Sequence, residues 1–143
     1  MSDAGYSGTP LGPKLGLKDG QRALLLRVPA GLDAISGFSG FRASETEIGT
    51  VAARDIDYAH VFETERSVLE ELAPKLATRL KPDGMLWVSW PKKASKRPTT
   101  LTEDVLREIF LPLGLVDVKV CAVDAVWSGL KFMFRREVRD RLS

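Results

Sequence analysis

Two stretches of the chain place tryptophan beside lysine and serine, a combination suited to binding an anionic molecule that carries a ring. They are Trp90-Pro91-Lys92-Lys93-Ala94-Ser95 and Trp127-Ser128-Gly129-Leu130-Lys131. Indole rings stack on flat rings, and lysine ammonium groups pair with phosphate or carboxylate. The alternative interpretation is that the tryptophans cap the core and the lysines belong to a solvated loop. The predicted ligand-binding residues are Trp90, Lys92, Lys93, Ser95, Trp127, Ser128 and Lys131.

The other reactive side chains form no recognisable catalytic or metal-binding pattern. His60, the only histidine, lies in the apolar run Tyr58-Ala59-His60-Val61-Phe62, which is more typical of a hydrogen-bonded packing residue than of a base. One cysteine, Cys121, and one histidine cannot build a zinc site. Asp55 and Asp57 lack further oxygen ligands for a cation, and no serine has a Gly-x-Ser-x-Gly context. We therefore predict no catalytic residue, no metal and no cofactor.

Composition indicates an ordinary single-domain protein of 143 residues. The 21 lysines and arginines nearly balance the 19 acidic residues, so the net charge of +2 indicates nucleic-acid binding only if a local patch is basic. A single cysteine suits a reducing compartment. The first residues lack the basic and apolar regions of a leader, and no apolar run is long enough to span a bilayer. We expect a cytoplasmic protein with no membrane partner.

Short, continuously apolar runs alternate with helical patterns along the chain. Continuous rather than alternating apolarity indicates strands buried on both faces, as in a parallel sheet. One helix is predicted after Thr64 as N-cap, with Pro74 expected to kink or break it. A second begins at Thr100, which forms a capping-box pattern with Glu103. The predicted strands are residues 22–28, 41–48, 58–62, 85–90, 115–123 and 130–134.

This alternation predicts an α/β fold with a shortened Rossmann-like open sheet, mostly parallel, and helices on both faces. The last two strands are joined by too little chain for a helical crossover, so they should form an antiparallel hairpin at the sheet edge. Residues 1–13 are expected to form a flexible arm, 14–136 the single α/β domain, and 137–143 a charged tail.

Two segments resemble those of Rossmann-type methyltransferases. They are Leu17-Lys18-Asp19-Gly20-Gln21-Arg22-Ala23-Leu24, before and into the first strand, and Leu80-Lys81-Pro82-Asp83-Gly84-Met85-Leu86, before a central strand. The resemblance covers most of the chain and implies S-adenosylmethionine as the cofactor. The usual Gly-x-Gly turn is replaced by Val28-Pro29-Ala30-Gly31, where one donor is lost and one glycine remains. Glu45 or Glu47 would be the acidic residue that such enzymes direct at the ribose.

Four other strings are similar to those of a family of small bacterial proteins with a domain of unknown function. They are Thr9-Pro10-Leu11 with Lys14-Leu15-Gly16, Trp87 to Lys93, Gly114 to Asp124, and Trp127 to Phe132. This second resemblance covers nearly the whole chain. It implies no established activity.

We interpret the sequence as an intracellular, non-catalytic binding or interaction module, and an enzyme is the less favoured class. Its Trp/Lys crevice would take an anionic, ring-bearing ligand, either a nucleotide or a nucleic acid. One alternative is a divergent S-adenosylmethionine-dependent methyltransferase-like enzyme. Another is a structural subunit, because Phe132 and Phe134 share one face of the terminal hairpin and could pair in a homodimer.

Overall fold

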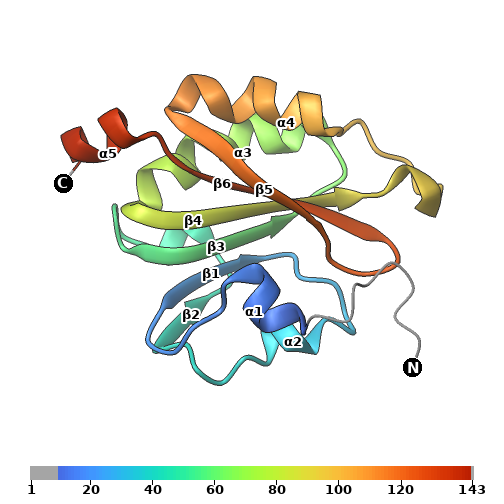
Figure 1. The fold of residues 1–143 in the computed structure, drawn as a ribbon, viewed down its shortest axis with the longest axis horizontal. Coiled ribbons are helices and arrows are strands. Elements are labelled where there is room, and N and C mark those ends of the chain that lie inside the picture. The colour runs from blue at the N-terminus through green and yellow to red at the C-terminus, as the bar shows by residue number, and fades with distance from the viewer. Residues whose placement is uncertain (1–9, 143) are drawn as a thin grey trace.

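The computed structural model describes residues 10–142, and six strands in this part of the chain form one sheet (Figure 1). The strand order is β2-β1-β3-β4-β6-β5. Strands β1 to β4 are mutually parallel, whereas β6 pairs antiparallel with both β4 and β5. The strands are β1 Arg22–Leu26, β2 Ala43–Glu45, β3 Ile56–Phe62, β4 Leu80–Pro91, β5 Leu115–Ala122 and β6 Trp127–Phe134. The predicted fold class, including the antiparallel terminal hairpin, is confirmed.

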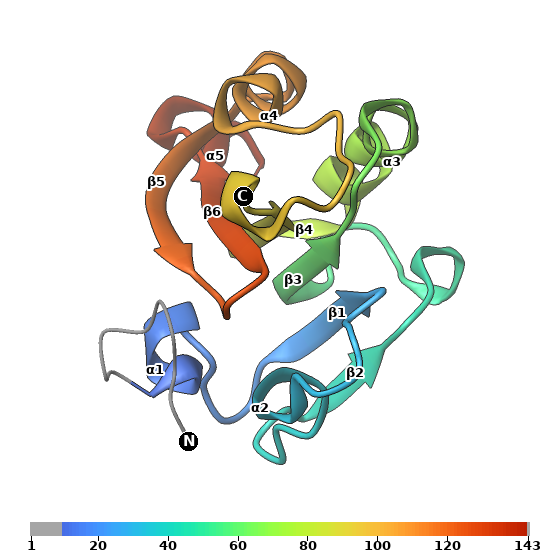
Figure 2. The same cartoon turned by 90° about the vertical axis from the view of Figure 1, so that its right-hand side faces the viewer.

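Helices cover both faces of the sheet (Figure 2). Helices α3 and α4 lie on one face, and α1 and α2 lie on the other. Three 3₁₀ turns complete the connections. The α-helices are α1 Leu11–Leu15, α2 Asp33–Ser36, α3 Arg66–Arg79, α4 Glu103–Phe110 and α5 Arg136–Leu142, and the turns are η1 Ile48–Thr50, η2 Lys93–Ser95 and η3 Leu111–Leu113. None of the helices in residues 10–142 is long and apolar enough to cross a membrane.

Parts of the predicted N-terminal arm and C-terminal tail are helical in the structure. Most of the predicted arm lies outside the described residues, but Leu11–Leu15 forms helix α1. Most of the predicted tail is helical, because Arg136–Leu142 forms α5 with Val138 buried. The division at residues 13 and 137 stays a prediction.

The predicted helix caps were wrong, and the reason is a contact between the two helices. Thr102, not Thr100, caps α4, and its hydroxyl accepts a hydrogen bond from the Val105 amide at 3.2 Å. The Thr100 hydroxyl instead accepts from the Arg66 amide at 2.6 Å, the first residue of α3. Thr100, which lies two residues before the N-cap of α4, therefore satisfies an amide at the start of α3. Helix α3 also continues through Pro74 without a break.

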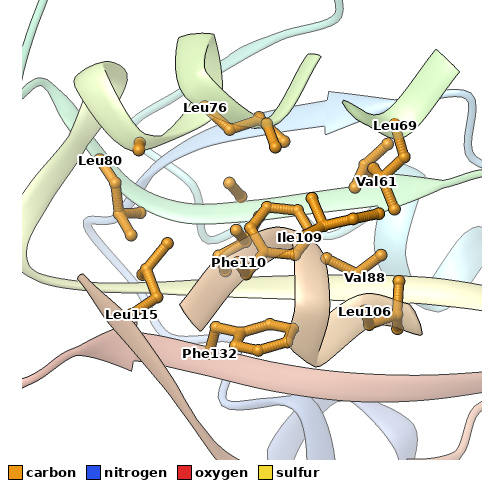
Figure 3. Packing of buried hydrophobic residues seen from close by; sticks show 14 of the residues in the cluster. Val61, Leu69, Leu76, Leu80, Val88, Leu106, Ile109, Phe110, Leu115 and Phe132 are labelled. Atoms are coloured by element: carbon orange, nitrogen blue, oxygen red, sulfur yellow. The ribbon is translucent and has the colours of Figure 1, made fainter. Parts of the chain in front are cut away.

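Two apolar cores, one on each face, hold the sheet in place. The larger lies under α3 and α4, where Leu69 and Leu76 meet Phe110 and Phe132 (Figure 3). On the other face Trp87 is fully buried, and its Nε1 donates a hydrogen bond of 2.8 Å to the Leu15 carbonyl oxygen at the end of α1. Both cores reach the edge of the sheet where the parallel strands end.

Candidate functional site

The order of the strands reverses between β1 and β3, and a charged residue follows each of these two strands. The chain leaves β1 toward β2 on one side, while β3 begins the other half of the sheet. Open α/β sheets bind ligands in the crevice at the carboxyl ends of strands where the order reverses. Arg27 follows β1 and Glu63 follows β3 at this position. Arg27 and Glu63 therefore lie where a ligand site is expected in this type of sheet.

Arg27 and Glu63 form an ion pair across the switch point. The Arg27 guanidinium donates to Glu63 Oε1 at 2.8 Å. Glu63 Oε2 accepts from the Thr64 and Glu65 amides at 2.8 and 3.0 Å. The Glu63 side chain is 3% exposed and the Arg27 side chain 68%. A buried carboxylate is thus held in one orientation, while its partner can leave toward solvent.

Arg27 also has an unusual backbone conformation, with φ of 63°. Non-glycine residues in the left-handed region are uncommon and often mark a functional position. Arg27 lines three neighbouring cavities of about 320, 250 and 240 Å³. Ligand pockets in proteins start at about 300 Å³. The Arg27 side chain therefore divides a crevice whose separate parts are at or below the size of a ligand site.

The largest of the three cavities, which we call the hydroxyl cavity, lies beside the carboxyl ends of β1 and β2. It is lined by Leu25, Arg27, Val28, Ser36, Ser44 and Thr46. The smallest, which we call the Glu63 cavity, is lined by Arg27, Pro29, Phe62, Glu63, Thr64 and Trp127.

The turn after β1 keeps open space despite its unusual sequence. Gly31 has φ of 95°, and a Cβ placed on it would meet no atom within 4 Å. Pro29 has no amide hydrogen to offer a ligand. Glu45 is engaged elsewhere, since it pairs with Arg22 at 3.2 Å and accepts from the Thr50 hydroxyl at 3.1 Å. Glu47 is exposed just before η1.

A fourth and larger cavity, of about 690 Å³, lies at the carboxyl end of β4 and the start of β6. We call it the basic cavity. Three predicted site residues line it: Trp90, Lys93 and Ser128. The full lining is Trp90, Pro91, Lys93, Lys96, Arg97, Pro98, Thr99, Leu101, Thr102, Glu103, Val120 and Ser128.

Lys92 and Ser95 belong to the same loop, and the Ser95 hydroxyl and the backbone groups of Lys92 hold that loop in place. The Ser95 hydroxyl donates to the Lys92 carbonyl oxygen at 2.7 Å and accepts from the Arg97 amide at 3.3 Å. The Lys92 amide donates to the Val126 carbonyl oxygen at 2.7 Å. These bonds fix the loop that carries Lys93 and Lys96.

Trp127 and Lys131 do not join Trp90. In the β4–β6 ladder Trp90 lies opposite Ser128, and Pro91 lies opposite Trp127. Opposed residues share a face and neighbours alternate, so the two indoles lie on opposite faces. Trp127 packs edge-on against Phe62, with ring centroids 5.2 Å apart, and lines the Glu63 cavity. The prediction that Trp90 and Trp127 belong to one Trp/Lys crevice was therefore wrong.

Lys131 lies further along β6, opposite Trp87 and Lys119. Burial lowers the pKa of the Lys131 ammonium, and the nearby charges of Lys119 and Lys18 lower the same pKa further. This lysine belongs to a group of cations on the sheet, and the basic cavity is lined by other residues.

His60 is part of a buried hydrogen-bonded chain. Its Nδ1 lies 3.0 Å from the Tyr58 hydroxyl, and its Nε2 lies 2.7 Å from the Ser89 hydroxyl. All three side chains are buried. Burial lowers the pKa of His60 to about 3 and raises the pKa of Tyr58 well above its usual value. The chain remains neutral at physiological pH and serves packing.

Among residues 10–142, no group of three or more histidine, cysteine, aspartate or glutamate side chains could hold a metal ion. Asp57 accepts from the Arg22 amide at 2.8 Å and pairs with Lys81 at 3.0 Å. Asp55 pairs with Arg22 at 3.3 Å. Cys121 is half-buried, which raises the pKa of its thiol.

Sequence reasoning missed Arg27, Glu63 and Thr99, and it placed Lys96 and Arg97 in the basic loop after Trp90 without counting them among the ligand-binding residues. A signal existed for the first two, because each is the charged residue directly after a buried strand. Their contact joins residues 36 positions apart, and no local pattern indicates it.

The strand order and the antiparallel hairpin define the Rossmann-like fold of S-adenosylmethionine-dependent methyltransferases. A methyltransferase of this kind from Aquifex aeolicus is 16% identical, with a TM-score of 0.64, over 86% of this chain and 87% of that chain. A ribosomal protein L11 methylase from Lactobacillus delbrueckii subsp. bulgaricus is 12% identical, with a TM-score of 0.64, over 88% and 76%. A putative type 11 methyltransferase from Sulfolobus solfataricus is 12% identical, with a TM-score of 0.60, over 87% and 89%.

At these identities the likeness establishes the fold. No family model matches the chain, and no curated protein matches it. The interpretation of the protein as a non-catalytic interaction module is contradicted, because its structural neighbours are methyltransferases. The alternative drawn from the sequence, a methyltransferase-like enzyme, is the better supported one.

Proposed function

We propose that the protein binds S-adenosylmethionine at the Arg27–Glu63 crevice and transfers its methyl group to an acceptor molecule. The observation that carries the proposal is the position of this ion pair. It lies at the switch point of a methyltransferase-type sheet, with the carboxylate buried and the guanidinium able to move.

The chemistry of the donor set fits the cofactor. S-adenosylmethionine carries an ammonium and a carboxylate on its amino-acid end, which complement the Glu63 carboxylate and the Arg27 guanidinium. Its nucleoside end carries hydroxyls and a flat ring. The hydroxyl cavity offers Ser36, Ser44 and Thr46 for hydrogen bonds, and Leu25 and Val28 for apolar contact. Pro29 reduces the backbone donors of the turn, so side chains supply more of the recognition.

When bound, S-adenosylmethionine supplies a methyl carbon that the acceptor's lone pair takes as the C–S bond breaks and its electron pair stays on sulfur. A proton displaced from the acceptor leaves to solvent. Glu63 would orient the ammonium of the bound cofactor, because the Thr64 and Glu65 amides hold the Glu63 carboxylate in place. Arg27 would pair with the carboxylate of the cofactor. The protein thus contributes binding and orientation.

Titration of S-adenosylhomocysteine into the purified protein by calorimetry tests the proposal. We expect one-to-one binding in the micromolar range. Arg27→Met should weaken that binding roughly tenfold or more, because one charge-assisted interaction is lost. Arg42→Met is the matched control, since Arg42 is an exposed cation just before β2, at the opposite edge of the sheet. Absence of binding at millimolar ligand, or equal affinity in the Arg27 variant, contradicts the proposal.

Three finer predictions stay with this proposal. We expect the protein in the cytoplasm, because a single free thiol suits a reducing compartment. Membership of the small bacterial family stays a prediction from its sequence strings, two of which lie on the adjacent strands β4 and β6. Pairing of two copies through the terminal hairpin would use β5, the strand at the edge of the sheet.

A further inference from the structure

We propose that the basic cavity is the acceptor site, and that the acceptor is a small organic acid with a flat, apolar body. The inference rests on the proposed methyl transfer, and it adds the substrate class. The cavity volume of about 690 Å³ is within the range of small-molecule sites in proteins.

The walls of the basic cavity are mainly apolar. Trp90, Pro91, Pro98 and Leu101 line it together with Val120. Val120 is 53% exposed, the highest value among the three exposed large hydrophobic residues in residues 10–142. An exposed valine beside a tryptophan in a concave surface is typical of a site that an apolar ligand covers. A nucleotide, which is polar over most of its surface, fits this lining less well.

The cations of the basic cavity have no acidic partner. Within residues 10–142 Lys93, Lys96 and Arg97 take part in none of the ion pairs, and all three are exposed. The one carboxylate in the lining, Glu103, pairs with Arg107 at 3.2 Å. The cavity therefore attracts an anion, such as a carboxylate group, at the η2 loop.

Hydrogen bonds join the lining of the basic cavity to the lining of the Glu63 cavity. Thr64 lines the Glu63 cavity, and Thr99 lines the basic cavity. The Thr99 hydroxyl donates to the Thr64 carbonyl oxygen at 2.7 Å, and the Thr100 amide donates to the same oxygen at 3.0 Å. These two hydrogen bonds connect the loop that lines the proposed acceptor site to the residue that follows Glu63 in the proposed cofactor crevice.

Fluorescent probes that differ only in charge type test the acceptor site. We choose 8-anilinonaphthalene-1-sulfonate, an apolar ring system with one anion, and its uncharged relative N-phenyl-1-naphthylamine. Both should bind the wild-type protein at one site. The double variant Lys93→Ala/Arg97→Ala should raise the dissociation constant of the anionic probe about tenfold or more and leave that of the neutral probe unchanged. Val120→Asp should weaken both probes.

The matched control is Lys18→Ala/Arg42→Ala, which removes two exposed cations outside the lining and should change neither dissociation constant. Equal binding of the anionic probe in the loop variant and the wild type overturns the inference. Displacement of the probe by adenosine monophosphate as readily as by 1-naphthoate overturns the assignment of an apolar body. Melting curves of the variants should coincide with the wild type, because the substituted side chains are exposed.

Titration of S-adenosylhomocysteine into the same variants separates the two proposals. We expect it to bind the loop variant with wild-type affinity and not to displace the probe. If S-adenosylhomocysteine binds but the loop variant binds the anionic probe as the wild type does, the proposed function stands and the acceptor site is wrong. If the loop variant binds the anionic probe more weakly but S-adenosylhomocysteine never binds, the proposed function is wrong, and so is the acceptor role of the cavity.

Discussion

The parallel strands begin at one edge of the sheet, the amino edge, and end at the other, the carboxyl edge. Both edges contain the same types of charged residue, but their side chains pair differently. At the amino edge, where β1, β3 and β4 begin, the charges neutralise one another. Arg22 pairs with Glu45 and Asp55, and Lys81 pairs with Asp57. These side chains are between 24% and 34% exposed, and each is paired with a side chain of opposite charge.

At the carboxyl edge several charges are not neutralised by residues of the described chain. Lys93, Lys96 and Arg97 have no acidic partner in the ion pairs of residues 10–142, and Arg27 holds Glu63 from an exposed position. Cavities occur between these groups, and two of the positive-φ residues, Arg27 and Lys96, are here. Lysine, arginine and carboxylate side chains occur at both edges, so the residue type alone does not distinguish a candidate binding site from a structural ion pair. The two differ in the strand end at which the charged residue lies.

The largest effect expected from this comparison is the loss of ligand binding in Glu63→Gln. The substitution keeps the shape of the side chain but removes a buried charge that faces the proposed ammonium group. Truncating one partner of a buried, hydrogen-bonded charge pair typically costs about 2–5 kcal/mol of binding free energy. Calorimetry with S-adenosylhomocysteine should therefore show an affinity at least roughly thirtyfold lower. Wild-type affinity in this variant would mean that the carboxyl edge is as structural as the amino edge.

The parts of the fold that were predictable from sequence are those that local pattern decides. Continuous apolar runs such as Leu24 to Leu26 and Ala59 to Phe62 indicate strands buried on both faces, and the structure buries them. The short link between β5 and β6 allows only a hairpin. Thr100 shows the limit, because its hydroxyl satisfies α3 across the fold rather than the helix that follows it.

The candidate site was predictable only in part, because a site depends on strand register. A shift of one residue between β4 and β6 would move Trp127 to the face of Trp90, and nothing in the local sequence specifies that register. The loop of Lys92 and Lys93 could be placed at a strand end because Pro91 ends the apolar run. The Arg27–Glu63 contact needed the order of β1 and β3 in the sheet, which appears only in three dimensions.

The second-largest expected effect concerns His60, which lies in the interior of the protein and hydrogen-bonds to neither edge of the sheet. The folded protein keeps His60 neutral, with a pKa of about 3, whereas the unfolded chain has an ordinary histidine pKa near 6.5. Between these values the unfolded chain binds a proton that the folded chain refuses, so the free energy of unfolding decreases as pH falls below about 6.5. Lowering the pH from 7 to 5 should cost about 2 kcal/mol.

Urea unfolding at the two pH values measures this loss, and His60→Gln is the control because the chain has no other histidine. The same loss should occur in Glu63→Gln and Asp57→Asn, since the His60 side chain hydrogen-bonds to Tyr58 and Ser89 and to neither edge. An identical pH dependence in the wild type and in His60→Gln would show that the imidazole is not held neutral.

The smallest effect belongs to the amino edge, in Asp57→Asn. The pair of Asp57 with Lys81 is partly exposed, at 27% and 31%, and such pairs contribute about 0–1 kcal/mol. The amide oxygen of asparagine can still accept from the Arg22 amide, which preserves the bond at the start of β1. We therefore expect a loss of about 1 kcal/mol or less in urea unfolding. Lys81→Met should lose a similar amount, and the double variant should lose no more than either alone, because both changes remove the same pair. The affinity for S-adenosylhomocysteine should stay at the wild-type value in all three proteins. A tenfold decrease in that affinity would show that the two edges are coupled. The distinction between a structural amino edge and a ligand-binding carboxyl edge would then be wrong.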